Sequence, residues 1–250
     1  MSTTISRISA ILFALLLLSA VPAQAATPAF VAASSCAEVN TTGTITCGIT
    51  LTAGDLLCIT FNAAAASVPT ITSVLWNTSE AMTLVKQQGN SNTFRSNWVY
   101  CLMGATSGAH DVVVIAACTC NVIVAKVFTY TNVNTGTPWD AGTTDGNSST
   151  GSASPTTTLS GGESGDLVVT TLLAAEDYST LTMTNGTKRS EQVTANASLF
   201  VIDQASSASN VQTNGTFGVS TAWTQVSFNV NASSSGGPPA GSLMLLGVGK

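Results

Sequence analysis

Apolar and polar residues alternate with a period of two along most of the chain, and β-branched residues recur at the apolar positions. Such alternation directs side chains to the two faces of an extended strand, whereas an amphipathic helix needs apolar residues every three to four positions. The pattern predicts strands at 44–51, 55–62, 70–76, 94–103, 111–118, 122–131, 166–174, 197–203 and 223–230. Short strands at a spacing of roughly ten residues predict an all-β, antiparallel β-sandwich.

One polar stretch, 132–162, is rich in Gly, Ser and Thr and has the composition of a linker. The sequence on its two sides is partly repeated: Gly-Asp-Leu-Leu at 54–57 and Gly-Asp-Leu-Val at 165–168 each open a predicted strand. Two related parts can be two domains or the two halves of one sandwich. We expect one domain, 26–232, and keep as the alternative two small domains that meet within the polar stretch.

The first 25 residues, 1–25, have the three parts of a secretory signal peptide. Arg7 lies in a polar start, an apolar run covers 8–20, and Ala-Gln-Ala at 23–25 fits a cleavage site. The alternative, a membrane anchor, is disfavoured because the run is shorter than the roughly 20 residues that span a bilayer. The last segment, 233–250, is expected to be an apolar tail or an edge strand, so no membrane span is expected after signal removal.

The predicted export signal is followed by six cysteines: Cys36, Cys47, Cys58, Cys101, Cys118 and Cys120. An even number of cysteines in an oxidising compartment predicts disulfides. Cys36 and Cys47 flank a hairpin-like segment and are the first pair we expect. Cys118 and Cys120 are two residues apart on a segment expected to be extended, so we expect each to bond a distant cysteine. Zinc is the weaker alternative, because no Cys-x-x-Cys occurs and His110 is the only histidine.

Charged residues make up only 8% of the chain, and its formal net charge is −5. Nucleic-acid binding needs clustered Lys and Arg to neutralise phosphates, and the sequence has no such cluster. A low charge combined with many Thr, Ser, Asn and Gly residues is typical of extracellular β proteins. We therefore expect a secreted or surface-exposed protein with no nucleic-acid partner.

Several short motifs follow one another along the chain, among them Ala53-Gly54-Asp55-Leu56-Leu57, Trp98-Val99-Tyr100, Gly108-Ala109-His110-Asp111, Thr137-Pro138-Trp139-Asp140 and Ser164-Gly165-Asp166-Leu167. Their order resembles that of a broad group of secreted bacterial and phage-associated β-sandwich domains, which are concanavalin-like or jelly-roll in shape and mostly without assigned function. The resemblance implies an exposed surface or virion domain and carries no catalytic residues. The six cysteines depart from the usual appearance of that group.

Tryptophans are the main candidates for a binding site, because flat indole rings stack on the apolar faces of sugars. Trp98 and Trp223 lie in apolar strands and are expected in the core. Trp139 lies in the polar stretch and is the best exposed candidate, with Asp140 beside it as a hydrogen-bonding carboxylate. Trp76 completes the predicted set of ligand-binding residues.

Other chemistry finds little support in the sequence. Asp140, Asp145 and Asn147 form an oxygen-rich segment that could hold calcium, but their spacing does not match an EF-hand loop, and a polar turn is the preferred interpretation. The carboxylates show no pattern that predicts the facing pair of a glycosidase. The sequence has no Gly-x-Ser-x-Gly motif whose serine could use His110 as its base, so His110 is expected to be a turn or edge residue. We expect no catalytic residues, no metal and no cofactor.

These observations lead us to expect a non-catalytic surface module for adhesion or carbohydrate binding. The alternative is a structural subunit of an extracellular assembly or virion, because low charge and Thr/Ser-rich strand edges suit self-association. A polysaccharide-active enzyme is the third expectation.

Overall fold

The computed structural model describes residues 25–39, 43–65, 68–90, 95–118, 120–160, 162–175 and 180–233. Thr27–Ser233 form one compact unit. Apart from Ala25 and Ser233, the predicted signal peptide and the predicted C-terminal tail lie outside the described residues.

All regular secondary structure of the described residues is β-strand. The N-terminal half contains β1 (Ala29–Ser35), β2 (Thr44–Leu51), β3 (Leu56–Ala64), β4 (Thr70–Trp76), β5 (Glu80–Ala81), β6 (Thr83–Asn90), β7 (Arg95–Met103), β8 (Gly108–Ala117) and β9 (Val122–Thr131). The C-terminal half contains β10 (Trp139–Ser152), β11 (Thr156–Leu159), β12 (Leu167–Ala175), β13 (Leu181–Asn185), β14 (Thr187–Val193), β15 (Ala197–Ala205), β16 (Val211–Phe217) and β17 (Thr221–Val230). The predicted all-β class is confirmed, and each predicted strand is present.

The strands form four sheets, two from each half, and every pairing is antiparallel. The N-terminal inner sheet has the order β1-β9-β3-β7-β6, and the N-terminal outer sheet has the order β2-β8-β4-β5. The C-terminal inner sheet has the order β10-β17-β12-β15-β14, and the C-terminal outer sheet has the order β11-β16-β13. The two halves therefore repeat one strand order, with β5 as the addition in the first half.

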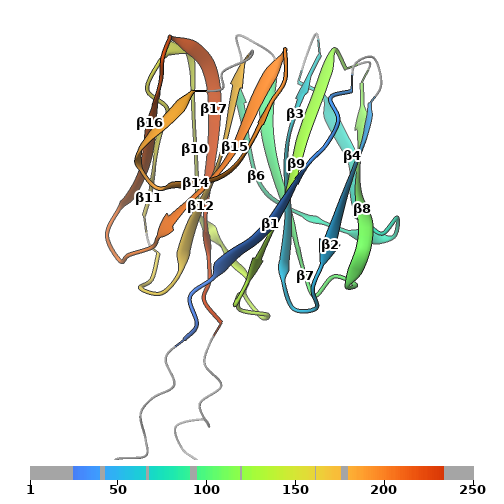
Figure 1. The fold of residues 1–250 in the computed structure, drawn as a ribbon, viewed down its shortest axis with the longest axis vertical. Coiled ribbons are helices and arrows are strands. Elements are labelled where there is room, and N and C mark those ends of the chain that lie inside the picture. The colour runs from blue at the N-terminus through green and yellow to red at the C-terminus, as the bar shows by residue number, and fades with distance from the viewer. Residues whose placement is uncertain are drawn as a thin grey trace, which may run out of the picture. The chain divides into compact units, whose positions relative to one another are not determined.

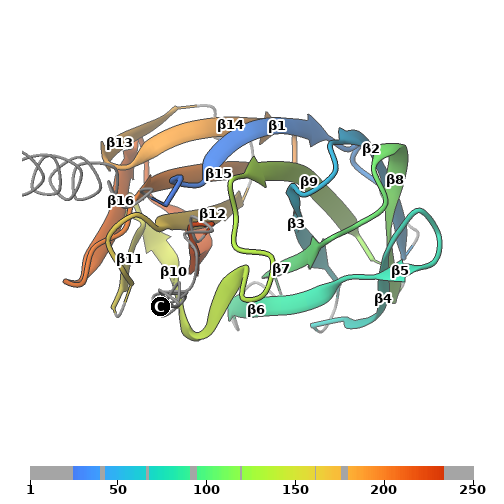
Figure 2. The ribbon, with the colours of Figure 1, turned by 90° about the horizontal axis from the view of Figure 1, so that it is seen from below.

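The sheets stack as four layers, with the two inner sheets in the middle (Figure 1; Figure 2). Strand β3 shows how the layers are built, because its side chains alternate between two cores. Leu57 and Ile59 face the N-terminal outer sheet, and Leu56 and Cys58 face the C-terminal half. The inner strands β3, β9, β12 and β17 are buried almost throughout because both of their faces are covered.

Equivalent turns lead into β3 and β12. Gly54 and Gly165 have φ angles of 88° and 103°, in the region that favours glycine over residues with a side chain. In both turns the next residue donates its backbone N–H three residues back, from Asp55 to the carbonyl of Thr52 and from Asp166 to that of Glu163. The repeated Gly-Asp sequence thus marks a structural repeat.

The polar stretch 132–162, which the alternative of two small domains takes as a linker, contains two strands. It contains the edge strand β10, which pairs with β17, and the short strand β11, which pairs with β16. Backbone hydrogen bonds hold such edge strands, so they form without the apolar alternation that the prediction required.

Polar side chains also join the two inner sheets. Tyr130 donates from its hydroxyl to Asp203 Oδ2 over 3.2 Å, and Arg189 Nε lies 2.7 Å from Asp203 Oδ1. Burial raises the pKa of Asp203, and Arg189 partly offsets this effect. The amide of Asn97 donates to the carbonyl and hydroxyl of Thr171 at 3.1 and 3.0 Å. These contacts fix the position of one half against the other.

Three disulfides link the six cysteines: Cys36–Cys47, Cys58–Cys101 and Cys118–Cys120. The first pair confirms the prediction from the hairpin-like segment. The expectation of distant partners for Cys118 and Cys120 was wrong, because their Cα atoms lie only 5.1 Å apart, closer than residues two apart in an extended strand. Disulfides are compatible with an extracellular protein.

Candidate functional site

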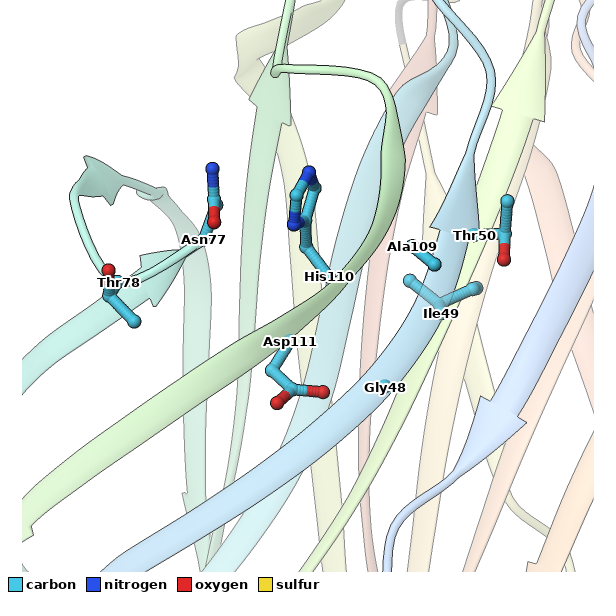
Figure 3. A pocket seen from close by; sticks show the side chains of 8 residues that line it. All are labelled: Gly48, Ile49, Thr50, Asn77, Thr78, Ala109, His110 and Asp111. Carbon is cyan, nitrogen blue, oxygen red and sulfur yellow. The ribbon is translucent and has the colours of Figure 1, made fainter.

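A shallow pocket lies at one end of the N-terminal outer sheet, beside the turn between β4 and β5 (Figure 3). Its volume is about 530 Å³, and it is open to solvent. Three short segments line it: 48–50 from β2, 77–78 from the turn, and 109–111 from β8. Strand pairing sets the first and last segments side by side, because Ile49 is the register partner of His110 and Gly48 that of Asp111.

The turn that forms one wall of the pocket has an uncommon backbone. Asn77 and Thr78 have φ angles of 47° and 63°, and a β-branched residue such as Thr78 rarely adopts this conformation. The backbone N–H of Asn77 donates to the carbonyl of Asp111 over 3.0 Å and ties the turn to β8. Residues held in sparsely populated backbone conformations occur preferentially at functional sites.

Trp76 packs against His110, one of the residues that line the pocket. Its ring meets the imidazole of His110 edge-on, with 5.4 Å between ring centroids and an interplanar angle of 86°. Its indole nitrogen donates to the carbonyl of Thr106 over 2.9 Å, and Glu80 accepts from the backbone N–H of Thr106 over 3.0 Å. The loop that leads into β8 is therefore held in place, and with it the position of His110.

The lining side chains can make hydrogen bonds of several kinds. The hydroxyls of Thr50 and Thr78 and the amide of Asn77 can donate and accept, the carboxylate of Asp111 accepts, and the imidazole of His110 does either according to its tautomer. In Figure 3 the side chains of Asn77 and His110 stand next to one another, and Asp111 points away from His110. Adjacent strand residues face opposite ways, so His110 and Asp111 do not form a catalytic pair.

The structure separates the predicted ligand-binding residues. Trp76 is fully buried in the N-terminal core, so the prediction that it stacks on a ligand was wrong, although its ring contacts His110, which lines the pocket. Trp139 is the first residue of β10, is partly buried, and packs against the core between the inner sheets. Trp139 therefore lies in a strand, and its indole is not fully exposed to solvent. Trp98 and Trp223 lie in cores, as predicted.

Asp140 lies in a polar cluster away from the pocket. Its carboxylate accepts hydrogen bonds from the amides of Asn231 and Asn229 at 2.9 and 3.4 Å. Asp145 and Asn147 do not join it: Asp145 accepts from the backbone of Gly146, and Asn147 donates to that of Thr156. Among the described residues, no three His, Cys, Asp or Glu side chains gather to hold a metal ion.

From the sequence, His110 is expected only to be a turn or edge residue, and the pocket is not predicted. The sequence contains a signal for the turn, since Asn-Thr-Ser at 77–79 follows an apolar strand, but nothing in it shows that β2 and β8 lie beside that turn. Comparisons of the chain with protein families, curated proteins and solved structures return no match.

Proposed function

We propose that the protein is a secreted, non-catalytic surface module that binds a carbohydrate in the pocket beside the β4–β5 turn. The observation that carries the proposal is the make-up of this pocket: it is shallow and open, and Thr50, Asn77, Thr78, His110 and Asp111 offer hydrogen-bonding groups around it. Sugars present hydroxyls that both donate and accept, so a wall of hydroxyl, amide, carboxylate and imidazole groups suits them. Adhesion to a glycan-bearing surface is the role that follows.

Two further features support a binding role. The turn at Asn77 and Thr78 keeps an unfavourable backbone conformation that the pairing with β8 maintains, and a rigid wall lowers the entropic cost of binding. The signal-peptide pattern and the disulfides suit a protein that meets ligands outside the cell.

The proposal is tested by screening the purified protein on a glycan array and measuring the affinity of the best ligand by calorimetry. Asp111→Asn and His110→Gln keep the size of the side chains, and each should weaken binding by about ten-fold through the loss of one or two hydrogen bonds. Thr216→Ala is the matched control, because Thr216 is exposed on β16, the strand of the second half that corresponds to β8.

Binding that survives both pocket variants, or an array without any ligand, would overturn the proposal. Light scattering on the same sample tests the alternative of a structural subunit: large concentration-dependent assemblies together with an empty array would favour self-association.

A further inference from the structure

The same four residues, Thr-Asn-Gly-Thr, occur twice in the second half of the chain, at 184–187 and at 213–216. No other asparagine of the sequence is followed by glycine. Asparagine before glycine is the pair most prone to lose its side-chain amide, because glycine has no Cβ to hinder the approach of its backbone nitrogen to the neighbouring amide carbon. The two copies have the same local chemistry, so a difference between them comes from the fold.

The first copy lies where the chain leaves the C-terminal outer sheet and enters the C-terminal inner sheet (Figure 2). Asn185 is the last residue of β13 and is exposed. Gly186 lies between β13 and β14 and belongs to neither strand, and its φ angle is 93°. Its backbone N–H has no hydrogen-bond partner among the residues that the structure describes. The backbone nitrogen beside Asn185 is therefore not held by strand pairing.

The second copy lies inside β16, the central strand of the C-terminal outer sheet. The backbone N–H of Gly215 donates to the carbonyl of Pro155 over 3.1 Å. Gly215 is buried, and a Cβ built on it would lie 2.9 Å from the carbonyl oxygen of Thr182. The side chain of Asn214 is engaged as well, since its Nδ2 donates to Gln212 Oε1 over 3.3 Å. Pairing with β11 on one side and β13 on the other thus holds this copy in place.

The loss of the amide needs no reactant other than water. The backbone nitrogen of Gly186 attacks Cγ of Asn185 and forms a bond to it, while Nδ2 leaves as ammonia with the proton of the attacking N–H. The product is a five-membered succinimide ring. Water then breaks one of the two bonds between the ring nitrogen and a carbonyl carbon. Opening at Cγ gives aspartate, and opening at the backbone carbonyl gives isoaspartate, in which the main chain runs through the side chain.

The ring closes only if the peptide group between the two residues turns until its nitrogen meets Cγ. At 185–186 this rotation breaks no hydrogen bond of the Gly186 N–H. At 214–215 it must first break the bond from Gly215 to Pro155 and move a buried glycine, which requires local opening of the outer sheet. Local opening of paired strands costs free energy, so only a small fraction of the molecules is able to react there at any time.

We propose that Asn185 is a site of spontaneous covalent modification, at which the folded protein deamidates to aspartate and isoaspartate, while Asn214 is protected. Either product adds a negative charge at the exposed crossing between the two sheets. Isoaspartate also lengthens the backbone by a carbon atom between two paired positions, because Asn185 pairs with Asn214 and Thr187 pairs with Asp203. This product therefore disturbs the entry of the chain into β14.

The experiment incubates the full, folded protein in a mildly alkaline buffer and follows the peptides that contain the two asparagines by mass spectrometry. Replacement of an amide by a carboxyl group raises the mass of the peptide. We expect this increase at Asn185 at least about ten-fold faster than at Asn214, because local opening limits the second reaction. In urea, with the disulfides reduced, the two rates should become similar, because the tetrapeptides are identical.

Anion-exchange chromatography of the intact protein gives a second readout. The wild type should accumulate a more acidic form during the incubation, and Asn185→Gln should not, because a longer side chain closes the ring far less readily. Asn214→Gln is the matched control and should accumulate the acidic form at the wild-type rate. Similar rates at the two asparagines of the folded protein, or an acidic form that persists in Asn185→Gln, would overturn the inference. Neither result bears on the carbohydrate proposal, because the pocket lies in the other half.

Discussion

The replacement Trp139→Ala separates a structural role of this residue from the ligand-stacking role that its sequence context suggested. The indole is partly buried, begins β10 opposite Val230, and packs against the core between the inner sheets. Truncating a fully buried Trp to Ala costs about 3–5 kcal/mol through lost contacts and the cavity left behind. Because Trp139 keeps part of its surface in water, we expect about 2–3 kcal/mol.

For a folded unit of this size, each kcal/mol lowers the thermal midpoint by about 2–4 °C, so Trp139→Ala should lower it by about 4–12 °C. Circular dichroism melts of the two proteins measure the effect. Trp139→Phe retains most of the packing area and should lose about 1 kcal/mol or less. A midpoint for Trp139→Ala within about 1 °C of the wild type would refute this role, and the residue would again be a candidate stacking platform.

Three further predictions follow from buried polar groups and disulfides. Asn62 is fully buried, and neither polar atom of its side chain has a hydrogen-bond partner among the residues that the structure describes. Asn62→Leu should therefore raise the free energy of unfolding by about 1–3 kcal/mol in urea denaturation, and a decrease would contradict this. Burial lowers the pKa of Lys126 from 10.5 to about 8, and the attraction of Glu191 only partly opposes this shift. Between these two pH values the unfolded chain keeps the Lys126 proton that the folded protein has lost, so the free energy of unfolding should rise with pH there. The raised pKa of Tyr130 has the opposite effect on stability above pH 10, so thermal melts are compared at about pH 7.5 and about pH 9.5. The wild type should be more stable at the higher of these pH values, and Lys126→Met should not show this increase. Mass spectrometry of a non-reduced digest should find Cys118 and Cys120 within one oxidised peptide, and a cross-link from either cysteine to another peptide would contradict the pairing.

The interior strands could be predicted from the sequence because the residues within each strand are enough to indicate it. Segments such as 122–131 and 197–203 are dense in apolar and β-branched residues, and such residues bury well in a sheet that is covered on both faces. The edge strands β10 and β14 are polar, and their order comes from backbone pairing with β17 and β15. No local signal distinguishes such a strand from a loop, so the sequence of the stretch 132–162 does not predict the strands that it contains.

The candidate pocket could not be predicted from the sequence because it depends on contacts between residues that are far apart in the chain. Its three segments lie far apart in the chain and meet only because β2, β8 and β4 are neighbours in one sheet. The hydrogen bonds of Asp140 with Asn229 and Asn231 depend on the same kind of contact, since Asp166 and Asn229 come together through the pairing of β12 with β17. Without that pairing, Asp140 could only be grouped with Asp145 and Asn147, its neighbours in sequence.

The most direct test of the carbohydrate proposal follows the imidazole of His110 by NMR during titration with the best ligand from the glycan array. His110 is the only histidine of the chain, so its ring signals need no further assignment. The proposal predicts that these signals shift saturably, with a midpoint equal to the calorimetric dissociation constant, and that backbone amides of Thr50 and Thr78 shift with them. Saturable binding that leaves the His110 ring unmoved and shifts signals around Trp139 instead would contradict it.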